Sequence, residues 1–210
     1  MLKVKKSVEL INPISYDEAL NTVEQAARNC YQSGDKISVG SAEKIVRFLI
    51  KNRHLTPIEF AGVTIKLVID RATMAQLTRH RLATFCIEST RYCNYNKSGE
   101  IKVIVPEGLN NHAYATWHTS MLMAETAYMK MIQEDKVSAE VARSVLPQSL
   151  ATTIFMHVNF RELRHILTLR LDSHAQRDIR VVMYDLLELV HGMYPVFFED
   201  IYKEYGEYSD

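Results

Sequence analysis

Several features that mark particular protein classes are absent or scarce in this sequence. The three cysteines include no C-x-x-C pair, which argues against a disulfide scaffold and fits a reducing compartment. No H-x-x-x-H pair and no Cys/His ligand spacing occurs, so no metal site is predicted. The charged side chains balance to a net charge of zero, which disfavours a nucleic-acid-binding protein.

Long apolar runs are missing as well. The N-terminus, Met1 to Lys6, leads into no apolar core of a signal peptide, and no stretch reaches the ~18 apolar residues of a membrane span. We therefore expect a cytoplasmic protein without membrane contact. Seven glycines and the lack of a Pro/Gly/Ser-rich linker favour one compact domain over residues 1–210.

The sequence does contain enough apolar material for a core, mostly at helical spacing. Hydrophobic residues make up 47% of the chain, a proportion typical of globular proteins. Ser15 with Glu18 forms a capping-box pattern at the start of the first helix, and alternation from Val63 to Ile69 predicts a half-buried strand. Helices are expected over residues 15–31, 41–54, 70–81, 110–134, 138–147, 159–171, 173–193 and 196–205, and strands over residues 63–69, 101–105 and 152–158.

The order of these elements indicates the fold class. The strands do not alternate with helices in βαβ order, so the prediction is a helix-rich α+β fold. Methionine and aromatic side chains form a stripe along the expected helix 110–134, which we interpret as core or subunit interface.

The most unusual stretch runs from Gln76 to Tyr95. Arg79, His80 and Arg81 stand in a row at an expected helix end, which an amphipathic pattern does not require. Such a run is commonly a solvated basic surface. The alternative is an anion site, because guanidinium groups make bidentate, charge-assisted bonds to phosphate, and hydroxyls and turn amides can complete the cradle.

Arg79-His80-Arg81, followed by seven residues and Ser89, resembles the R-H-R-x7-S signature of the flavin-dependent thymidylate synthases. Further segments are similar to other motifs of that family and follow in the same order, beyond what coincidence explains. These segments are His54 to Glu59 (H-x-T-P-x-E), Glu140 to Pro147 (E-x-A-R-x-x-L-P), Asn159 to Arg161 (N-x-R) and Leu169 to Gln176 (L-R-x-D-S-H-A-Q).

The resemblance implies a fold, a reaction and an assembly. The fold is a single α+β domain with a small, mostly antiparallel sheet, and the assembly is a homotetramer with shared active sites. The reaction is the reductive methylation of dUMP to dTMP, with methylenetetrahydrofolate as carbon donor and tetrahydrofolate as product. FAD is the implied cofactor and NADPH its reductant, so the partners are the small molecules dUMP and folate.

The resemblance also implies roles for individual residues at the dUMP site. We expect Arg91 and Arg143 to bind the phosphate, and Arg170 to be the catalytic electrophile. A guanidinium on a uracil carbonyl would stabilise the enolate-like charge that develops on the ring. The plainer alternatives are a helix ion pair for Arg143 and a helix-end position for Arg170. The implied dUMP group is Gln76, Arg79, Ser89, Thr90, Arg91, Arg143 and Arg170.

A second group is implied for the flavin. His80 would stack on the isoalloxazine ring or hydrogen-bond to it, whereas a lone histidine between arginines is otherwise commonly solvated. Glu59 and His174 are weaker candidates near the flavin. The implied FAD group is Thr56, Arg79, His80, Arg81, Asn159, Arg161 and His165.

Ser89 and the residues before it limit the alternatives. No base can be placed beside Ser89, so we interpret it as a phosphate ligand and not as a nucleophile. Cys86 and Ile87 stand where the family commonly has polar side chains, and Glu88 follows them. This departure leaves open an altered pyrimidine substrate or one-carbon chemistry, or an inactive nucleotide- or flavin-binding regulator. A cysteine-nucleophile thymidylate synthase is disfavoured, because no Pro-Cys-His context surrounds Cys86 or Cys93.

Overall fold

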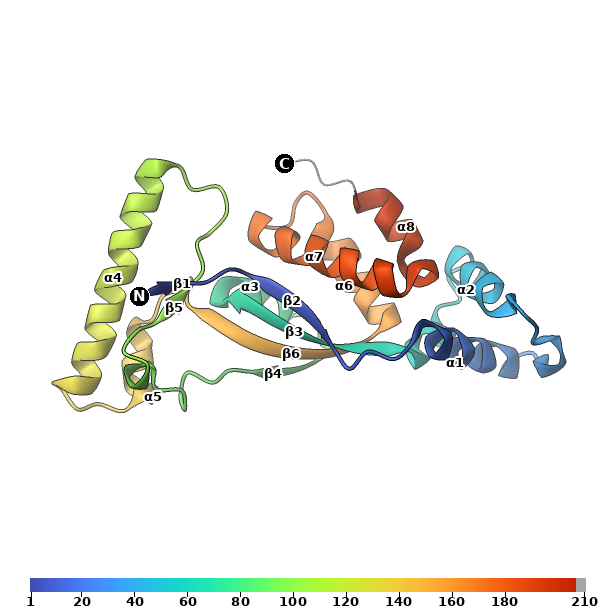
Figure 1. Cartoon of the computed structure of the whole chain (residues 1–210), viewed down its shortest axis with the longest axis horizontal. Helices are drawn as coiled ribbons and strands as arrows, with labels where there is room; N and C mark the ends of the chain where they lie inside the picture. The colour runs from blue at the N-terminus through green and yellow to red at the C-terminus, as the bar shows by residue number, and fades with distance from the viewer. Residues whose placement is uncertain (207–210) are drawn as a thin grey trace. The chain divides into compact units, whose positions relative to one another are not determined.

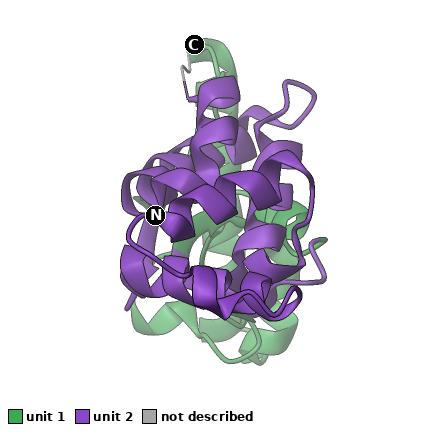
Figure 2. Cartoon of the chain, turned by 90° about the vertical axis from the view of Figure 1, so that its right-hand side faces the viewer, with its two compact units in different colours: residues 1–7, 67–79, 86–154 green, residues 8–66, 80–85, 155–210 purple. Residues whose placement is uncertain are grey.

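The computed structural model describes residues 1–206, and their contacts group into two compact units whose segments alternate along the chain (Figure 2). Unit 1 comprises residues 1–7, 67–79 and 86–154. Unit 2 comprises residues 8–66, 80–85 and the described residues from 155 onward. The single domain over residues 1–210 stays a prediction.

Four strands form the main sheet, in the order β2-β3-β6-β4 (Figure 1). In unit 2 the Phe160 amide donates to the Ala61 carbonyl, and in unit 1 the Arg71 amide donates to the Gln148 and Leu150 carbonyls. As the residue number rises from 61 to 71 along β3, the number of its partner falls from 160 to 150 along β6. The two strands are therefore antiparallel. The helix-rich α+β class with a small antiparallel sheet is confirmed. The strands are β2 (Ser7–Ile11), β3 (Gly62–Asp70), β4 (Thr84–Ile87) and β6 (Ala151–Asn159).

Alternation along β3 follows the pattern expected from the sequence. Val63 and Ile65 in unit 2, and Leu67 and Ile69 in unit 1, are all buried, while the residues between them are partly exposed. Successive side chains of a strand point to opposite faces, so one face of β3 packs in the core.

Unit 1 adds a second, smaller sheet and three helices. The strands β1 (Leu2–Lys3) and β5 (Lys102–Val103) are paired in parallel. The buried hydrophobic cluster of unit 1 consists of Ile101, Val103, Met121 and Leu150. The helices are α3 (Arg71–Leu77), α4 (Asn111–Gln133) and α5 (Ala139–Ala142).

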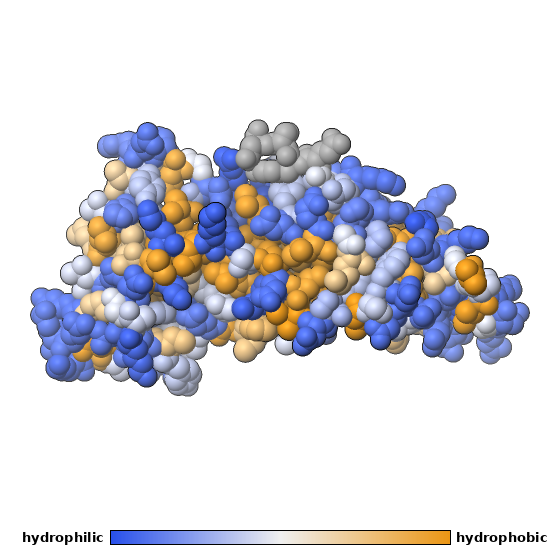
Figure 3. Space-filling view, viewed as in Figure 1, coloured by the Kyte–Doolittle hydropathy of each residue, from blue (hydrophilic) through white to orange (hydrophobic). Residues whose placement is uncertain are grey.

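The long helix α4 leaves apolar side chains on the surface. Only Met121 and Tyr128 of this helix are buried, whereas Leu122 and Met123 are 42% and 68% exposed. Figure 3 shows hydrophobic side chains among hydrophilic ones over this helix. The homotetramer implied by the sequence stays a prediction.

Unit 2 is built from helices around an aromatic centre. The Phe160 ring lies 4.8 Å from the Tyr194 ring and 4.9 Å from the Phe197 ring, in the tilted arrangements that aromatic pairs prefer. The short 3-10 helix η2 (Thr56–Phe60) packs against α1 and α6. The α-helices are α1 (Tyr16–Asn29), α2 (Ser41–Lys51), α6 (Phe160–Leu171), α7 (Arg177–Met193) and α8 (Pro195–Tyr205).

Three expectations about element boundaries were wrong. The polar loop expected after Arg81 contains β4, where the Glu88 amide at its end donates to the Thr153 carbonyl in unit 1. Helix α3 ends at Leu77 and does not reach Arg81, and the Thr78 hydroxyl bonds back to the Met74 carbonyl. The helix expected from residue 173 begins at residue 177, after a turn. Strand β4 owes its place to pairing with β6, which helical spacing in the sequence does not reveal.

Strand β2 was not expected from the sequence, and β5 is shorter than the strand expected over residues 101–105. Within residues 1–206 no helix combines the length and apolar character needed to cross a bilayer.

We predict that Gly62→Ala destabilises the protein by about 1–3 kcal/mol, because a Cβ at this position would meet the Val158 carbonyl oxygen at 2.8 Å. Urea unfolding would measure the change. Gly34→Ala is the matched control, since nothing lies within 4 Å of its Cβ position. Equal effects of the two substitutions would contradict the close approach of β3 and β6.

Candidate functional site

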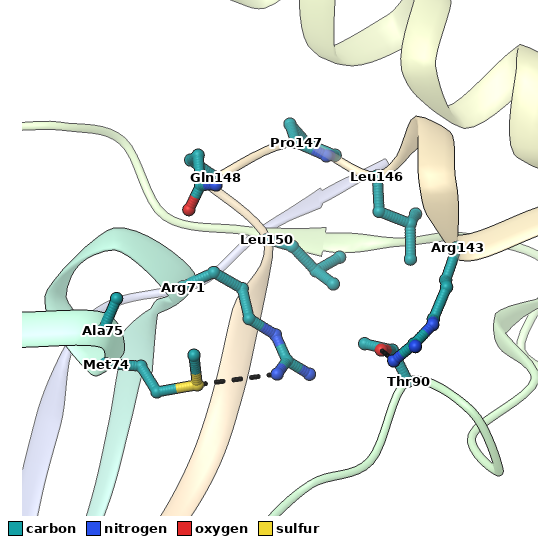
Figure 4. Close-up of a pocket in the computed structure, with 9 residues that line it drawn as sticks. All are labelled: Arg71, Met74, Ala75, Thr90, Arg143, Leu146, Pro147, Gln148 and Leu150. Atoms are coloured by element: carbon teal, nitrogen blue, oxygen red, sulfur yellow. Dashed lines mark hydrogen bonds between the residues drawn. The ribbon is translucent and has the colours of Figure 1, made fainter. Parts of the chain in front are cut away.

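Unit 1 contains a small pocket into which two arginines point (Figure 4). The pocket has a volume of about 270 Å³. Arg143, directly after α5, donates from Nη1 to the Thr90 hydroxyl at 3.3 Å. Both residues were assigned to dUMP from the sequence, and the structure brings them together. The pocket is lined by Arg71, Met74, Ala75, Thr90, Arg143, Leu146, Pro147, Gln148 and Leu150.

Arg71 is the pocket residue that the sequence analysis missed. It is the first residue of α3, and the Asp70 side chain caps this helix by accepting from the Thr73 amide at 2.8 Å. Its Nη2 donates to the Glu88 carbonyl at 2.9 Å, while its buried Nε has no hydrogen-bond partner in the described structure. Its Nη1 donates to the Met74 sulfur at 3.5 Å, so both terminal nitrogens of this guanidinium are held at the pocket (Figure 4). Its place after a capping aspartate was the only signal in the sequence.

The loop that carries Ser89, Thr90 and Arg91 is fixed through Glu88. The Tyr95 hydroxyl donates to the Glu88 carboxylate at 2.8 Å, and burial together with this bond raises the pKa of Tyr95. The Ser89 carbonyl accepts from the Cys93 amide at 2.9 Å and closes a turn. The polar side chain of Glu88 therefore stabilises the loop from within.

The other residues assigned to dUMP in unit 1 do not line this pocket. The guanidinium of Arg91 lies 2.8 Å from the Glu140 carboxylate, with both side chains about half exposed. Gln76 is on α3, and Arg79 is exposed beyond its end. Their roles toward dUMP stay predictions.

In unit 2, helix α6 presents several residues of the implied flavin group. Asn159 caps the helix, because its side-chain oxygen accepts from the Glu162 amide at 2.8 Å. Arg161 and His165 are four residues apart and so share one face of the helix. Asn159, Arg161 and His165 line a pocket of about 850 Å³ in this unit.

A second pocket of unit 2 adjoins the first. It has a volume of about 440 Å³ and includes Thr56. Arg53, Leu55 and Arg161 line both pockets. These three residues form a wall that the two pockets share. The Arg161 guanidinium lies 2.6 Å from the Glu59 carboxylate, so Glu59 neutralises one cation of this shared wall.

A buried cluster in unit 2 joins His80 to Arg170. His80 is 5% exposed, and its Nε2 accepts from the Arg170 Nε–H at 3.0 Å. His80 must therefore be neutral with the proton on Nδ1, which lies 3.7 Å from the Glu162 carboxylate. The His165 ring meets the His80 ring edge-on, with centroids 5.9 Å apart. Burial, the Arg170 charge and His165 lower the pKa of His80 to about 4.

Two of the remaining candidates stay apart from these clusters. Arg81 is exposed, and it lines neither of the unit 2 pockets described here. The His174 side chain is 95% exposed, with Nδ1 2.8 Å from the Asp172 carboxylate. Hydrogen bonds from His174 lower the pKa of Asp172. Over residues 1–206, no group of three or more His, Cys, Asp or Glu side chains is arranged to hold a metal ion.

The implied dUMP residues other than Arg170 belong to unit 1, and the implied FAD residues other than Arg79 belong to unit 2. The helix-rich α+β fold thus contains one arginine-lined pocket in unit 1 and two adjoining pockets in unit 2. Residues 12–196 match the family described as thymidylate synthase complementing protein. The chain therefore belongs to this family.

Relatives and a solved structure agree with that membership. A flavin-dependent thymidylate synthase of Geobacter sulfurreducens is 33% identical over 187 residues, which cover 85% of this chain and 80% of that protein. The enzyme of the same name from Pyrococcus horikoshii is 32% identical, with 90% and 79% covered. The structure of a UMP/dUMP methylase, PolB from Streptomyces cacaoi, bound with 5-Br dUMP, matches with a TM-score of 0.82 at 25% identity and covers both chains fully.

We predict that His80 makes stability depend on pH. Because its folded pKa of about 4 lies below the ordinary value of 6.5, the unfolded chain binds the proton first. The free energy of unfolding should therefore fall as pH decreases from about 6.5 to about 4, and His80→Gln should reduce that fall. Urea unfolding across this range measures it, with the exposed His112→Gln as control. An unchanged pH profile in His80→Gln would contradict the buried neutral ring.

Proposed function

We propose that this protein methylates dUMP to dTMP. In the proposed reaction C5 of the uracil gains the methylene carbon of methylenetetrahydrofolate, and tetrahydrofolate is released. The two electrons that convert methylene to methyl come from reduced FAD, which NADPH regenerates. The observation that carries the proposal is the unit 1 pocket, where Arg71, Arg143 and Thr90 converge in a chain of zero net charge.

The pocket suits a nucleotide monophosphate. A phosphate monoester carries nearly two negative charges at neutral pH, and two guanidinium groups match that charge. The Thr90 hydroxyl supplies a further donor beside Arg143. In this proposal Arg91 joins the phosphate ligands by exchanging its exposed partner Glu140 for the ligand. An exposed ion pair contributes little to stability, so the exchange costs little.

The residues of unit 2 fit a flavin dinucleotide. Such a ligand needs cationic groups for its phosphates and flat polar walls for its rings, and both unit 2 pockets offer Arg53 and Arg161 beside apolar Leu55. In the larger pocket, Asn159 and His165 would hold the cofactor, and Thr56 would hold it in the adjoining one. When bound, the flavin would supply the hydride.

Arg170 is proposed as the catalytic electrophile. The neutral His80 ring accepts the Nε–H of its guanidinium and so fixes the orientation of the group. Directed at a uracil carbonyl, this charge would stabilise the enolate-like charge that builds on the ring when C6 accepts hydride. Glu162 would keep the His80 proton on Nδ1 and thus maintain the acceptor at Nε2.

No enzyme nucleophile is part of the proposal. The Ser89 hydroxyl oxygen accepts from the Arg91 amide at 3.3 Å, and no histidine bond to it is found in the described residues. Neither Cys86 nor Cys93 lines the arginine pocket. The folate contacts, the use of NADPH and a homotetramer with shared sites belong to the same proposal.

An anaerobic turnover experiment tests this function. The purified protein would be loaded with FAD, its visible spectrum recorded, and NADPH, dUMP and methylenetetrahydrofolate added. We expect bleaching of the flavin bands followed by dTMP and tetrahydrofolate, and a loss of turnover of at least about 100-fold in Arg170→Lys with flavin retained. Bound flavin without dTMP would indicate a regulator or altered chemistry, and a protein that binds no FAD would contradict the proposal.

A second candidate substrate is UMP. The match to a UMP/dUMP methylase over the full length of both chains favours it, together with Cys86 and Ile87 at positions where polar side chains were expected. Competition between dUMP and UMP under the same conditions would decide between the two pyrimidine nucleotides. Formation of dTMP alone would restrict the enzyme to the deoxynucleotide.

We predict that Arg71→Lys weakens dUMP binding about tenfold, since an ammonium group cannot replace the bidentate fork that a phosphate requires. Calorimetric titration measures the Kd. Deoxyuridine, which lacks the phosphate, is the matched control and should bind the variant and the native protein equally. Equal losses for dUMP and deoxyuridine would show that Arg71 acts only by holding the loop at Glu88.

A further inference from the structure

Arg53 occupies a backbone position that normally favours glycine. It follows helix α2 with φ +57°, and the His54 amide donates to the Leu49 carbonyl at 2.9 Å, as at a helix end closed by a left-handed residue. Side chains other than glycine and asparagine are disfavoured in this region. Arginine is therefore an uncommon residue at this position.

Position distinguishes Arg53 from the other residues with positive φ. Asn12, Gln32 and Lys136 share this backbone conformation, but none of them lines the pockets described above. Arg53 lines both pockets of unit 2 and stands in the wall that joins them. Its exposed side chain therefore lies where the two pockets meet.

The charges of these pockets leave Arg53 without a counterion. Arg161 is paired with Glu59 at 2.6 Å, and Arg164 is paired with Asp200 at 2.6 Å. No hydrogen bond or ion pair of the Arg53 guanidinium is found in the part of the chain that the structure describes. The Glu162 carboxylate also lines the larger pocket, so what distinguishes Arg53 among the described residues is the lack of a direct carboxylate partner.

We propose that Arg53 binds the pyrophosphate of the flavin dinucleotide and so selects FAD over FMN. A flavin dinucleotide has two ring systems joined by two phosphates. The two pockets are likewise joined by residues that line both of them, and these include the cations Arg53 and Arg161. The larger pocket, with Asn159 and His165, takes one ring system. The smaller pocket, with apolar Leu49 and Pro57, takes the other. This inference rests on the proposed use of a flavin.

Arg53→Gly tests the proposal with opposite effects on binding and stability. Removing the side chain should weaken FAD binding about tenfold, the usual worth of a charge-assisted hydrogen bond, and should leave FMN binding unchanged. Because glycine accepts φ +57°, the thermal midpoint should stay equal or rise. Gln32→Gly, which follows α1 with φ +48°, is the matched control and should change neither flavin affinity. Flavin fluorescence quenching measures the Kd without turnover.

Each contrary result has a separate meaning. An unchanged FAD Kd in Arg53→Gly would overturn the proposal, and a raised KM for NADPH in that variant would assign the guanidinium to the phosphate of the reductant instead. Equal weakening of FAD and FMN would also overturn it, since FMN has no pyrophosphate. A native protein that binds no flavin would contradict the proposed function itself.

Discussion

The candidate sites depend on two strand ends at which a polar side chain starts a helix. β3 ends at Asp70, whose carboxylate accepts from both the amide and the hydroxyl of Thr73, and β6 ends at Asn159, which accepts from the Glu162 amide. A cap of this kind contributes about 1 kcal/mol and fixes the first turn. The helix after Asp70 presents Arg71 in unit 1, and the helix after Asn159 presents Arg161 in unit 2. Strand and helix together set the direction of these cations.

Charge is distributed unevenly although its sum is zero. Most arginines near the pockets have a carboxylate partner, such as Glu59 for Arg161, or a carbonyl partner, such as Glu88 for Arg71. Arg170 also donates to the neutral ring of His80. In the proposed function, the substrate supplies negative charge at Arg71 and Arg143, and the cofactor supplies it at Arg53.

The sequence predicted the helix-rich α+β class because helical spacing and the alternation along β3 depend on near neighbours. It also predicted that Thr90 and Arg143 act together, through motif resemblance. Strand β4 was missed because its pairing partner β6 lies far along the chain. Arg71 and Arg53 were missed for a related reason. Arg71 is notable because its buried Nε has no hydrogen-bond partner among the described residues, and Arg53 because its backbone is left-handed. The spacing of residues in the sequence encodes neither property.

The most direct measurement is a crystal structure of the protein with FAD and dUMP bound. The account predicts the dUMP phosphate within hydrogen-bond distance of Arg71 and Arg143 in unit 1, and the flavin in the adjoining pockets of unit 2 with Arg53 at its pyrophosphate. A dUMP phosphate bound away from both Arg71 and Arg143, or a flavin outside the unit 2 pockets, would contradict the assignment of the two ligands to the two units.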